Sequence, residues 1–475
     1  MEYTGVFEML KIGIGPSSSH TLGPWRAAEG FVRELVETGT ISQLTSLEVH
    51  LYGSLALTGI GHGSDTALIM GLSGADPVTV PLGEVQRVPQ TVSSTQTLLV
   101  AGQREITFDP QLHLFYHKDE RLPFHSNGML FLATGPGGEE MHRSTCYSVG
   151  GGSVVRDGSL FTATDPFEVP WSAESGEELI SHCEEHGLRI SELARANELA
   201  LRSEEELAAH LTAVWEVMKN AAYRGATTNG HLPGGLEVER RAKRIVERVA
   251  GPPPSSGAEE WLATLRALEA DFPHTLKLIS AFAIAVNEEN AACGRIVTAP
   301  TNGSAGVIPA VLMYYSCFSG VNAGRLEIEN FLLVASIVGS MFRRRATISA
   351  AMGGCQAEIG VSSAMAAAAL AEGLGGSPEQ ALMAAEIAME HHLGMTCDPI
   401  GGLVQIPCIE RNSMGAVKAI AAATLAMESD PRDAKVSFDD VVQTMWATAQ
   451  DMDVRYKETS QAGLAVNVSV RVPEC

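Results

Sequence analysis

The stretch that decides the fold reads SAAMGGCQAEIGVSS over residues 349–363 and EHHLGMTCDPIGGLVQIPCIERN over residues 390–412. Its cysteines, Cys355, Cys397 and Cys408, stand close to Gly or Pro in loop-like sequence at the ends of Ala-rich helical segments. Such loops can direct a thiolate without the restrictions of helix geometry, and the thiolate is the form of cysteine that binds metals. The pattern indicates metal ligands; ordinary buried cysteines are the alternative.

The spacing of these cysteines narrows the kind of metal site. They lie too far apart for the paired CxxC of a zinc ribbon or for the closely spaced run of a ferredoxin. Because iron–sulfur clusters take four cysteine thiolates, three cysteines leave a fourth position open to substrate or to a ligand from elsewhere. The last residue of the chain, Cys475 in VRVPEC, is a candidate for that position.

Composition and charge exclude several classes of partner. The chain has 475 residues and a formal charge of −23, which disfavours nucleic acid and anionic membranes as partners. We expect a small molecule or a second copy of the chain instead.

The longest apolar run, 331–342, is too short to span a bilayer and predicts a buried helix. Eight scattered cysteines and an N-terminus without an apolar signal segment predict a reduced, cytoplasmic protein.

Hydroxyl and imidazole side chains gather near the N-terminus in GPSSSHTLGP, residues 15–24. The candidate binding residues there are Ser17, Ser18, Ser19, His20 and Thr21. They precede a predicted amphipathic helix over 25–35, and hydroxyls with free backbone N–H groups before a helix can bind an anion such as a carboxylate. A plain helix cap with surplus serines is the alternative.

A second candidate segment, GIGHGSD at residues 59–65, follows a predicted strand over 46–52 whose apolar residues alternate with polar ones. His62 lies between glycines, so a ligand could approach it closely. We expect Asp65 to orient the imidazole and raise its basicity, although a lone histidine is more often structural.

The chain is predicted to form two domains of different class. Strand patterns continue through 105–108, 112–116 and 129–134 and nearly vanish beyond 157–176, after which the pattern is helical, as over 188–210. We therefore predict an α+β protein: an N-terminal α/β domain over 1–160, a linker over 161–176 and an all-α domain over 177–475.

Two details of the helical region can be placed closely. Ser377 is a predicted N-cap with Gln380 three residues later and Pro378 at the first helical position, and Gly394 is the predicted end of that helix. Between two other helices lies a polar, Gly-containing loop, 293–306, whose segment 298–303 has donors and acceptors suited to the carboxylate and ammonium of an amino acid. Its candidate residues are Thr298, Thr301, Asn302 and Gly303. A simple helix connector is the alternative.

A series of longer strings occurs in one order along the chain: GPSSSHTLGP, YGSLALTGIGHGSDTALIMGL, SVGGG, VTAPTNG, GCQAEIG, GSPEQ, EHHLGMTCDP, QIPCIERN and ETSQAGLA. Together they closely resemble the bacterial single-chain iron–sulfur L-serine dehydratases (L-serine ammonia-lyases). The resemblance covers essentially the whole chain, and the order of so many strings makes it specific.

This resemblance implies a helical domain that holds a [4Fe–4S] cluster and a homodimer that acts on L-serine. The implied cluster ligands are Cys355, Cys397, Cys408 and, when substrate is absent, Cys475. It also implies that the segments 17–21 and 298–303 bind substrate and that His62 is the base. We expect His20 to be the second candidate for the base. The implied reaction is dehydration of L-serine to pyruvate and ammonia.

Three other functions are disfavoured by the sequence. A pyridoxal phosphate dehydratase needs a Schiff-base lysine, and Lys418 is the only one in a comparably apolar stretch; at helical spacing it is expected to reach the surface. A non-catalytic iron–sulfur amino-acid sensor would need an output surface, which the acidic balance does not offer. A zinc hydrolase is disfavoured because His391 and His392 are adjacent and point to different faces of a helix.

Overall fold

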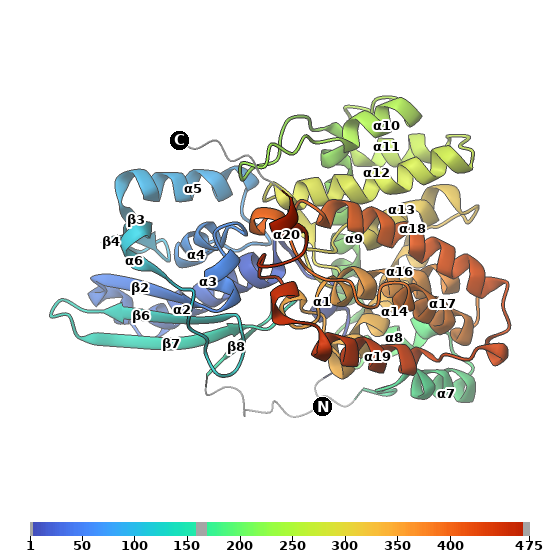
Figure 1. The fold of residues 1–475 in the computed structure, drawn as a ribbon, viewed down its shortest axis with the longest axis horizontal. Helices are drawn as coiled ribbons and strands as arrows, with labels where there is room; N and C mark the ends of the chain where they lie inside the picture. Colours follow the sequence, from blue (N-terminus) through green and yellow to red (C-terminus); the bar gives the residue numbers. More distant parts are fainter. Residues whose placement is uncertain (1–2, 158–168, 469–475) are drawn as a thin grey trace.

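The protein consists of a sheet with its helices beside a larger bundle of helices (Figure 1). The structure is a computed structural model that describes residues 3–157 and 169–468. The predicted linker falls partly, and Cys475 wholly, outside the described residues, so the domain bounds stay a prediction. In the described residues no helix is both long enough and apolar enough to cross a membrane.

The N-terminal part contains one principal sheet with the strand order β5-β2-β6-β7-β8. Its strands are β2 (Ser46–Tyr52), β5 (Leu114–His117), β6 (Gly128–Thr134), β7 (Glu140–Ser148) and β8 (Val154–Arg156). β2 pairs parallel with β5 and antiparallel with β6, placing Val49 opposite Phe131. A separate hairpin joins β3 (Thr97–Val100) to β4 (Arg104–Thr107).

Helices cover one face of this sheet. They are α2 (Gly23–Glu37), α3 (Ser54–Thr58), α4 (Ser64–Leu72) and α6 (Pro110–His113), whereas α5 (Leu82–Thr95) packs on α4 and on β3. The alternating residues Leu47, Val49 and Leu51 of β2 are buried in a core with α2 and α4, and Phe31 stacks on Phe131 with ring centroids 5.2 Å apart. The predicted strand over 46–52 is thereby confirmed, since alternation lets one face of a strand enter the core.

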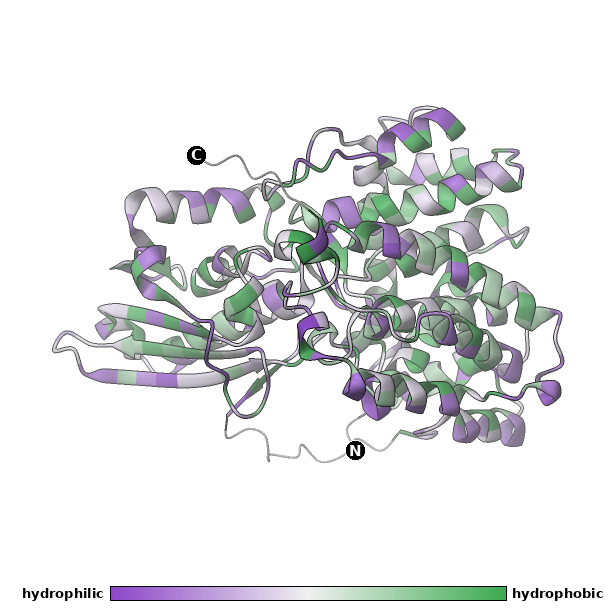
Figure 2. Ribbon diagram, in the orientation of Figure 1, coloured by the Kyte–Doolittle hydropathy of each residue, from purple (hydrophilic) through white to green (hydrophobic). Residues whose placement is uncertain are grey.

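The C-terminal part is helical. Its helices are α7 (Gly176–His186), α8 (Ile190–Leu199), α9 (Glu204–Thr227), α10 (Ala242–Ala250), α11 (Ala258–Arg266), α12 (Phe272–Ala291), α13 (Val307–Phe318), α14 (Arg325–Arg345), α15 (Ala350–Gly353), α16 (Ile359–Gly373), α17 (Pro378–Glu390), α18 (Cys408–Met427), α19 (Phe438–Asp451) and α20 (Leu464–Asn467). The Ala-rich α16 packs against α13, α14, α17 and α18. It is apolar on nearly every side (Figure 2), as expected of a central buried helix.

The first residues of the chain belong to the helical part rather than to the sheet. α1 (Val6–Met9) packs on α14, and β1 (Ile12–Ile14) pairs antiparallel with β9 (Arg295–Val297). The sequence had suggested only loop where β9 forms. This pairing anchors the segment that begins at Gly15 against the helical part, between the two halves of the molecule.

Capping explains which helix bounds were predictable. The Ser377 side chain accepts a hydrogen bond from Gln380 N, and α17 begins at Pro378 as predicted. It ends at Glu390, because residues 391–394 form turns and Gly394 adopts a φ of 80°. The predicted buried helix over 331–342 lies within α14.

The helical pattern predicted over 188–210 is confirmed, but it covers two helices, because the chain breaks between α8 and α9. Ser203 starts the second helix: its hydroxyl accepts from Glu206 N, and the Glu206 carboxylate accepts from Ser203 N. This reciprocal pair satisfies two N–H groups that a helix start leaves without partners. The break therefore has a local cause that periodicity alone conceals.

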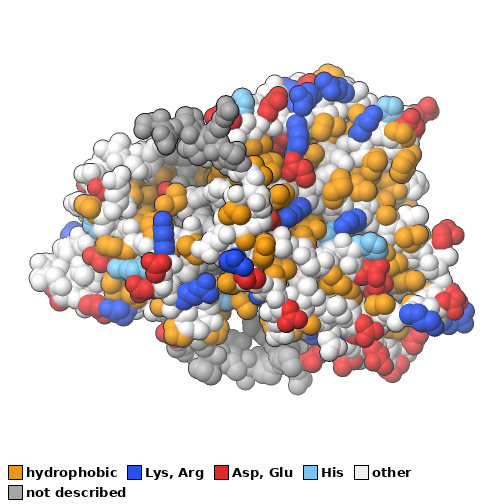
Figure 3. Space-filling view, viewed as in Figure 1, with side chains coloured by type: hydrophobic (Ala, Val, Ile, Leu, Met, Phe, Trp, Pro, Cys, Tyr) orange, Lys and Arg blue, Asp and Glu red, His pale blue; other side chains and the backbone are white. Residues whose placement is uncertain are grey.

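The surface carries charges of both signs. On the face shown in Figure 3, basic and acidic side chains are interspersed, and acidic ones gather toward the lower right, where Figure 1 places α7 and α19. This distribution agrees with the acidic balance of the chain.

Candidate active site

Three segments of the helical part bring the cysteine thiols together. Cys355 begins a short 3-10 turn before α16, Cys408 is the first residue of α18, and Cys397 lies in an extended segment that bridges to Lys457. Their exposed fractions are 2%, 7% and 4%, respectively. The Sγ atoms of Cys355 and Cys397 and a carboxylate oxygen of Glu358 all lie within 4.8 Å of one another, a spacing at which they could share a metal ion. Cys408 is not within this group, but its thiol is near enough to interact electrostatically with Cys355.

The protonation of the thiols is unequal. A hydrogen bond from the Cys397 thiol lowers the pKa of Cys355 to about 7, and the Arg411 guanidinium acts in the same direction. The Cys397 pKa lies well above its ordinary value, chiefly because that thiol donates to Cys355, and burial raises the pKa of Cys408. The protein alone thus favours one thiolate, and three buried thiolates would require a multivalent cation.

Arg411 connects the thiols to the surrounding chain. Its Nη1 donates to Cys355 Sγ at 3.2 Å and to Thr396 O at 2.7 Å. Its Nη2 pairs with Asp398 Oδ1 at 3.0 Å. The planar guanidinium can hold these three groups at once, which a lysine could not do.

Two histidines reach the same region from the N-terminal part. His20 and His62 are buried, with ring centroids 4.6 Å apart. Glu458 lies beside both: its Oε1 is 3.7 Å from His20 Nδ1 and 3.9 Å from His62 Nε2. Burial lowers the pKa of His62 to about 4 and holds that of His20 well below its ordinary value, so both imidazoles are neutral near pH 7.

The hydrogen bonds distinguish the two imidazoles. His62 Nδ1 donates to Thr58 O at 2.8 Å, which leaves the lone pair on Nε2 free. His20 Nδ1 bonds Ser19 Oγ at 2.7 Å and its Nε2 bonds Ser54 Oγ at 3.1 Å, so both of its nitrogens are engaged. The expected orientation of His62 by Asp65 is wrong, since Thr58 supplies that contact. Asp65 instead lines a pocket of about 550 Å³ with Pro16 and Cys293.

The segment 17–21 forms a buried π-helical turn before α2, and its hydroxyls are linked to the histidines. Ser17 Oγ accepts from His20 N at 3.2 Å and lies 3.2 Å from Ser19 Oγ. Thr21 Oγ1 accepts from Ser17 N and donates to His62 O at 2.6 Å. Ser18 is buried in the same turn.

The segment 298–303 is brought to the same place by β1 and β9. Asn302 Nδ2 donates to Ile14 O at 3.1 Å, whereas its Oδ1 is buried without a hydrogen-bond partner among the described residues. Gly303 leaves room for the Glu358 carboxylate, which a Cβ at that position would meet at 2.6 Å. The Thr298 hydroxyl instead hydrogen-bonds the backbone of Lys11, and the Thr301 hydroxyl hydrogen-bonds the Ser304 hydroxyl.

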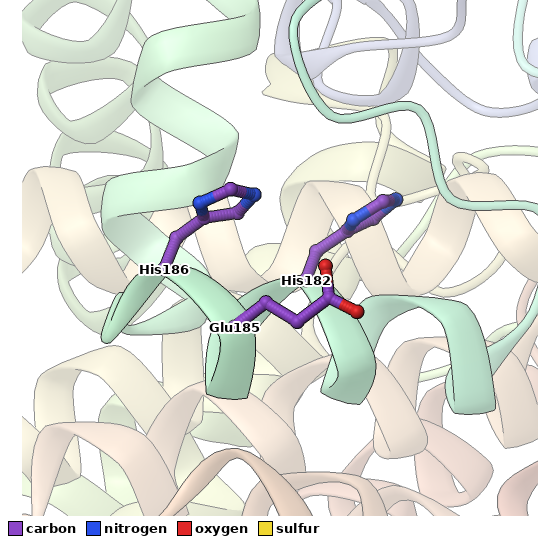
Figure 4. A group of neighbouring side chains, drawn as sticks. All are labelled: His182, Glu185 and His186. Atoms are coloured by element: carbon purple, nitrogen blue, oxygen red, sulfur yellow. The ribbon is translucent and has the colours of Figure 1, made fainter.

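A second group of possible metal ligands lies elsewhere, on α7. Figure 4 shows His182 and His186 rising from successive turns, with the Glu185 carboxylate close to His182. Unlike the cysteines, these side chains are exposed or half-buried, and His182 Nε2 lies 3.2 Å from Ser172 O. The group therefore lacks the enclosure of the thiol site.

Sequence reasoning missed four groups that the fold adds to the site: Ser54, Glu358, Arg411 and Glu458. Three of them are charged residues inside GCQAEIG, QIPCIERN and ETSQAGLA. For Glu358 and Arg411 the available signal was a charged side chain within a string that also carries a predicted cysteine ligand, whereas the string of Glu458 carries none. Ser54 carried none.

The arrangement is that of an enzyme site enclosed between a sheet domain and a helical domain, and comparison with known families agrees. Residues 5–159 match the serine dehydratase beta chain, and residues 185–465 match the serine dehydratase alpha chain. The protein belongs to the serine dehydratase family.

Bacterial relatives are similar along almost their full lengths. The L-serine dehydratase of Streptomyces coelicolor is 46% identical, and L-serine dehydratase 2 of Escherichia coli is 47% identical, each over 98% of both chains. The L-serine dehydratase of Helicobacter pylori is 40% identical over 97% of this chain and 98% of its own.

Proposed function

We propose that the protein dehydrates L-serine to pyruvate and ammonia with a [4Fe–4S] cluster bound by Cys355, Cys397 and Cys408. The observation that carries this proposal is the convergence of three buried thiols with two neutral imidazoles and two polar segments. The full-length similarity to L-serine dehydratases supports the substrate. We also propose, from the resemblance alone, the homodimer and the binding of Cys475 at the fourth iron when substrate is absent.

The donor set fits an iron–sulfur cluster. The buried thiols lie close enough for Cys397 to donate to Cys355, and only one of them is readily ionised without a metal. Thiolate ligation would remove the other two protons and match the negative charge with iron. An iron with an exchangeable position supplies Lewis acidity to the substrate hydroxyl, which is otherwise a poor leaving group.

The chain itself handles the α-proton. His62 is the preferred base because its Nε2 lone pair is free and its imidazole is neutral. Removing the α-proton as hydroxide leaves yields 2-aminoacrylate and water; the enamine then becomes an imine, which water hydrolyses to pyruvate and ammonia. The hydroxyls of the segment 17–21 and the second N–H of the Asn302 Nδ2 group, whose first donates to Ile14 O, would hold the substrate carboxylate and so orient the Cα–H bond.

Pyridoxal phosphate is the alternative cofactor for this reaction, and no structural observation favours it. Lys418 Nζ donates to His391 O just beyond α17. This exposed contact holds the side chain of Lys418, the candidate Schiff-base lysine, in line with the expectation that it reaches the surface.

The proposal is tested with anaerobically purified protein, by recording its visible spectrum and its pyruvate production from L-serine before and after exposure to air. We expect a brown protein in which colour and activity are lost together. A colourless, active protein would contradict the cluster. A protein that holds an intact cluster but forms no pyruvate would contradict serine dehydration.

A further inference from the structure

The backbone holds Glu458 firmly at the centre of the site. Glu458 N donates to Cys397 O at 3.0 Å, and Ser54 Oγ donates to Glu458 O at 3.3 Å. The residue has a φ of 59°, in the left-handed region that side chains other than glycine rarely adopt. Such a conformation persists where the surroundings impose it, and it is common at functional sites. The position of this carboxylate is thus determined by both domains.

The Glu458 carboxyl group has no cationic partner among the described residues, and burial, with the nearby Glu358 and Cys355, holds its pKa well above the ordinary value. The residue is 5% exposed, and its ion-pair neighbours are His20 and His62, both of which burial keeps neutral. Its Oε2 is buried and makes no hydrogen bond to any described group. A buried carboxyl oxygen without a donor is costly, which points to a ligand that supplies donors and positive charge.

We propose that Glu458 binds the α-ammonium group of the amino-acid substrate. This inference rests on the proposed function and adds the residue that recognises the substrate as an amino acid. An ammonium group offers three N–H donors and no acceptor. It can therefore donate to both carboxylate oxygens of Glu458, Oε1 and Oε2.

The geometry links this contact to the chemistry. The ammonium nitrogen and the α-proton are bonded to the same carbon, so fixing the nitrogen restricts where the proton can point. Glu458 Oε1 lies 3.9 Å from His62 Nε2, the free basic nitrogen. An ammonium held by Glu458 therefore places Cα beside His62, while the polar segments 17–21 and 298–303 remain for the carboxylate.

A pocket lies against the residues on either side of Glu458 in the chain. A pocket of about 190 Å³ is lined by Ser54, Thr459 and Met352, among others. Ser54 bonds His20, and Thr459 follows Glu458 in the chain.

The test compares two unreactive ligands that differ only in the ammonium group, L-alanine and propionate. Each is titrated calorimetrically into the anaerobic holoprotein and into its Glu458→Gln variant. We expect the substitution to weaken L-alanine binding roughly 10- to 100-fold, because one partner of a buried charge pair is lost, and to change propionate binding less than about 3-fold. Glu386→Gln, which changes another buried carboxylate with an unpaired oxygen, on α17, is the matched control.

Equal weakening of both ligands would overturn the inference, since a purely structural role affects them alike. Equal affinity of the unmodified protein for L-alanine and propionate would overturn it too, even if the Gln variant failed to fold or to hold its cluster. Glu458→Asp keeps the charge and should retain part of the preference for L-alanine. If the unmodified holoprotein forms no pyruvate from L-serine, the proposed function fails, whatever Glu458 binds.

Discussion

The two halves of the site are built in different ways. The thiol group (Cys355, Cys397 and Cys408) comes from three loops of one helical part, close together in the sequence. The histidine pair (His20 and His62) comes from the other part, and Glu458, near the end of the chain, contacts it. The thiol group is suited to holding a charged cofactor, and the histidine pair supplies neutral bases. Because the two sets lie in different parts of the molecule, each environment can shift the pKa values of its own side chains independently.

The largest effect is expected when a cysteine of the thiol group is removed. Cys355→Ala removes the thiol with the lowered pKa and the contact with Arg411, so we expect loss of the cluster absorbance and of measurable pyruvate formation. Iron content and the visible spectrum of the anaerobic protein measure this. Cys183→Ala, a buried cysteine of the helical core, is the control and should keep both. Full iron content in Cys355→Ala would contradict the ligand assignment.

The next effect separates the two histidines. His62→Ala should lower kcat about 10²- to 10⁴-fold, the usual contribution of a general base, and should abolish exchange of the α-proton with solvent. His20→Ala should mainly raise KM, because His20 orders the hydroxyls of Ser19 and Ser54. Exchange is followed by NMR in deuterated buffer.

His182→Ala, on the exposed face of α7, is the control for these variants and should leave kcat and KM unchanged. Retention of exchange in His62→Ala together with its loss in His20→Ala would reverse the roles of the two histidines.

The smallest expected effect concerns Arg411, which supports the thiol group from outside it. Arg411→Lys keeps a positive charge but cannot contact Cys355, Thr396 and Asp398 together. We expect a roughly 10-fold faster loss of iron to a chelator, the scale seen when groups supporting metal ligands are changed. Arg432→Lys, whose partner Asp430 lies on the surface, is the matched control. Equal iron loss in both variants would show that Arg411 does not support the ligands.

Local patterns predicted some elements well and others poorly. The alternation over 46–52 and the cap at Ser377 specify their elements because the cause lies within a few residues. The break before α9 was missed although the capping pair Ser203 and Glu206 was present, because the apolar period continued across it. β9 was missed because its partner, β1, is far away in the sequence.

By itself, the sequence determined the two structural classes, the three candidate thiol ligands and the two histidine segments, since periodicity, caps and loop residues act locally. Only the tertiary structure decided that Thr58 orients His62, that Arg411 supports Cys355, and that Glu458 lies between two imidazoles. These contacts join residues that side-chain packing brings together across both parts of the molecule. Neither spacing nor composition specifies such packing, because it depends on every interface between those residues.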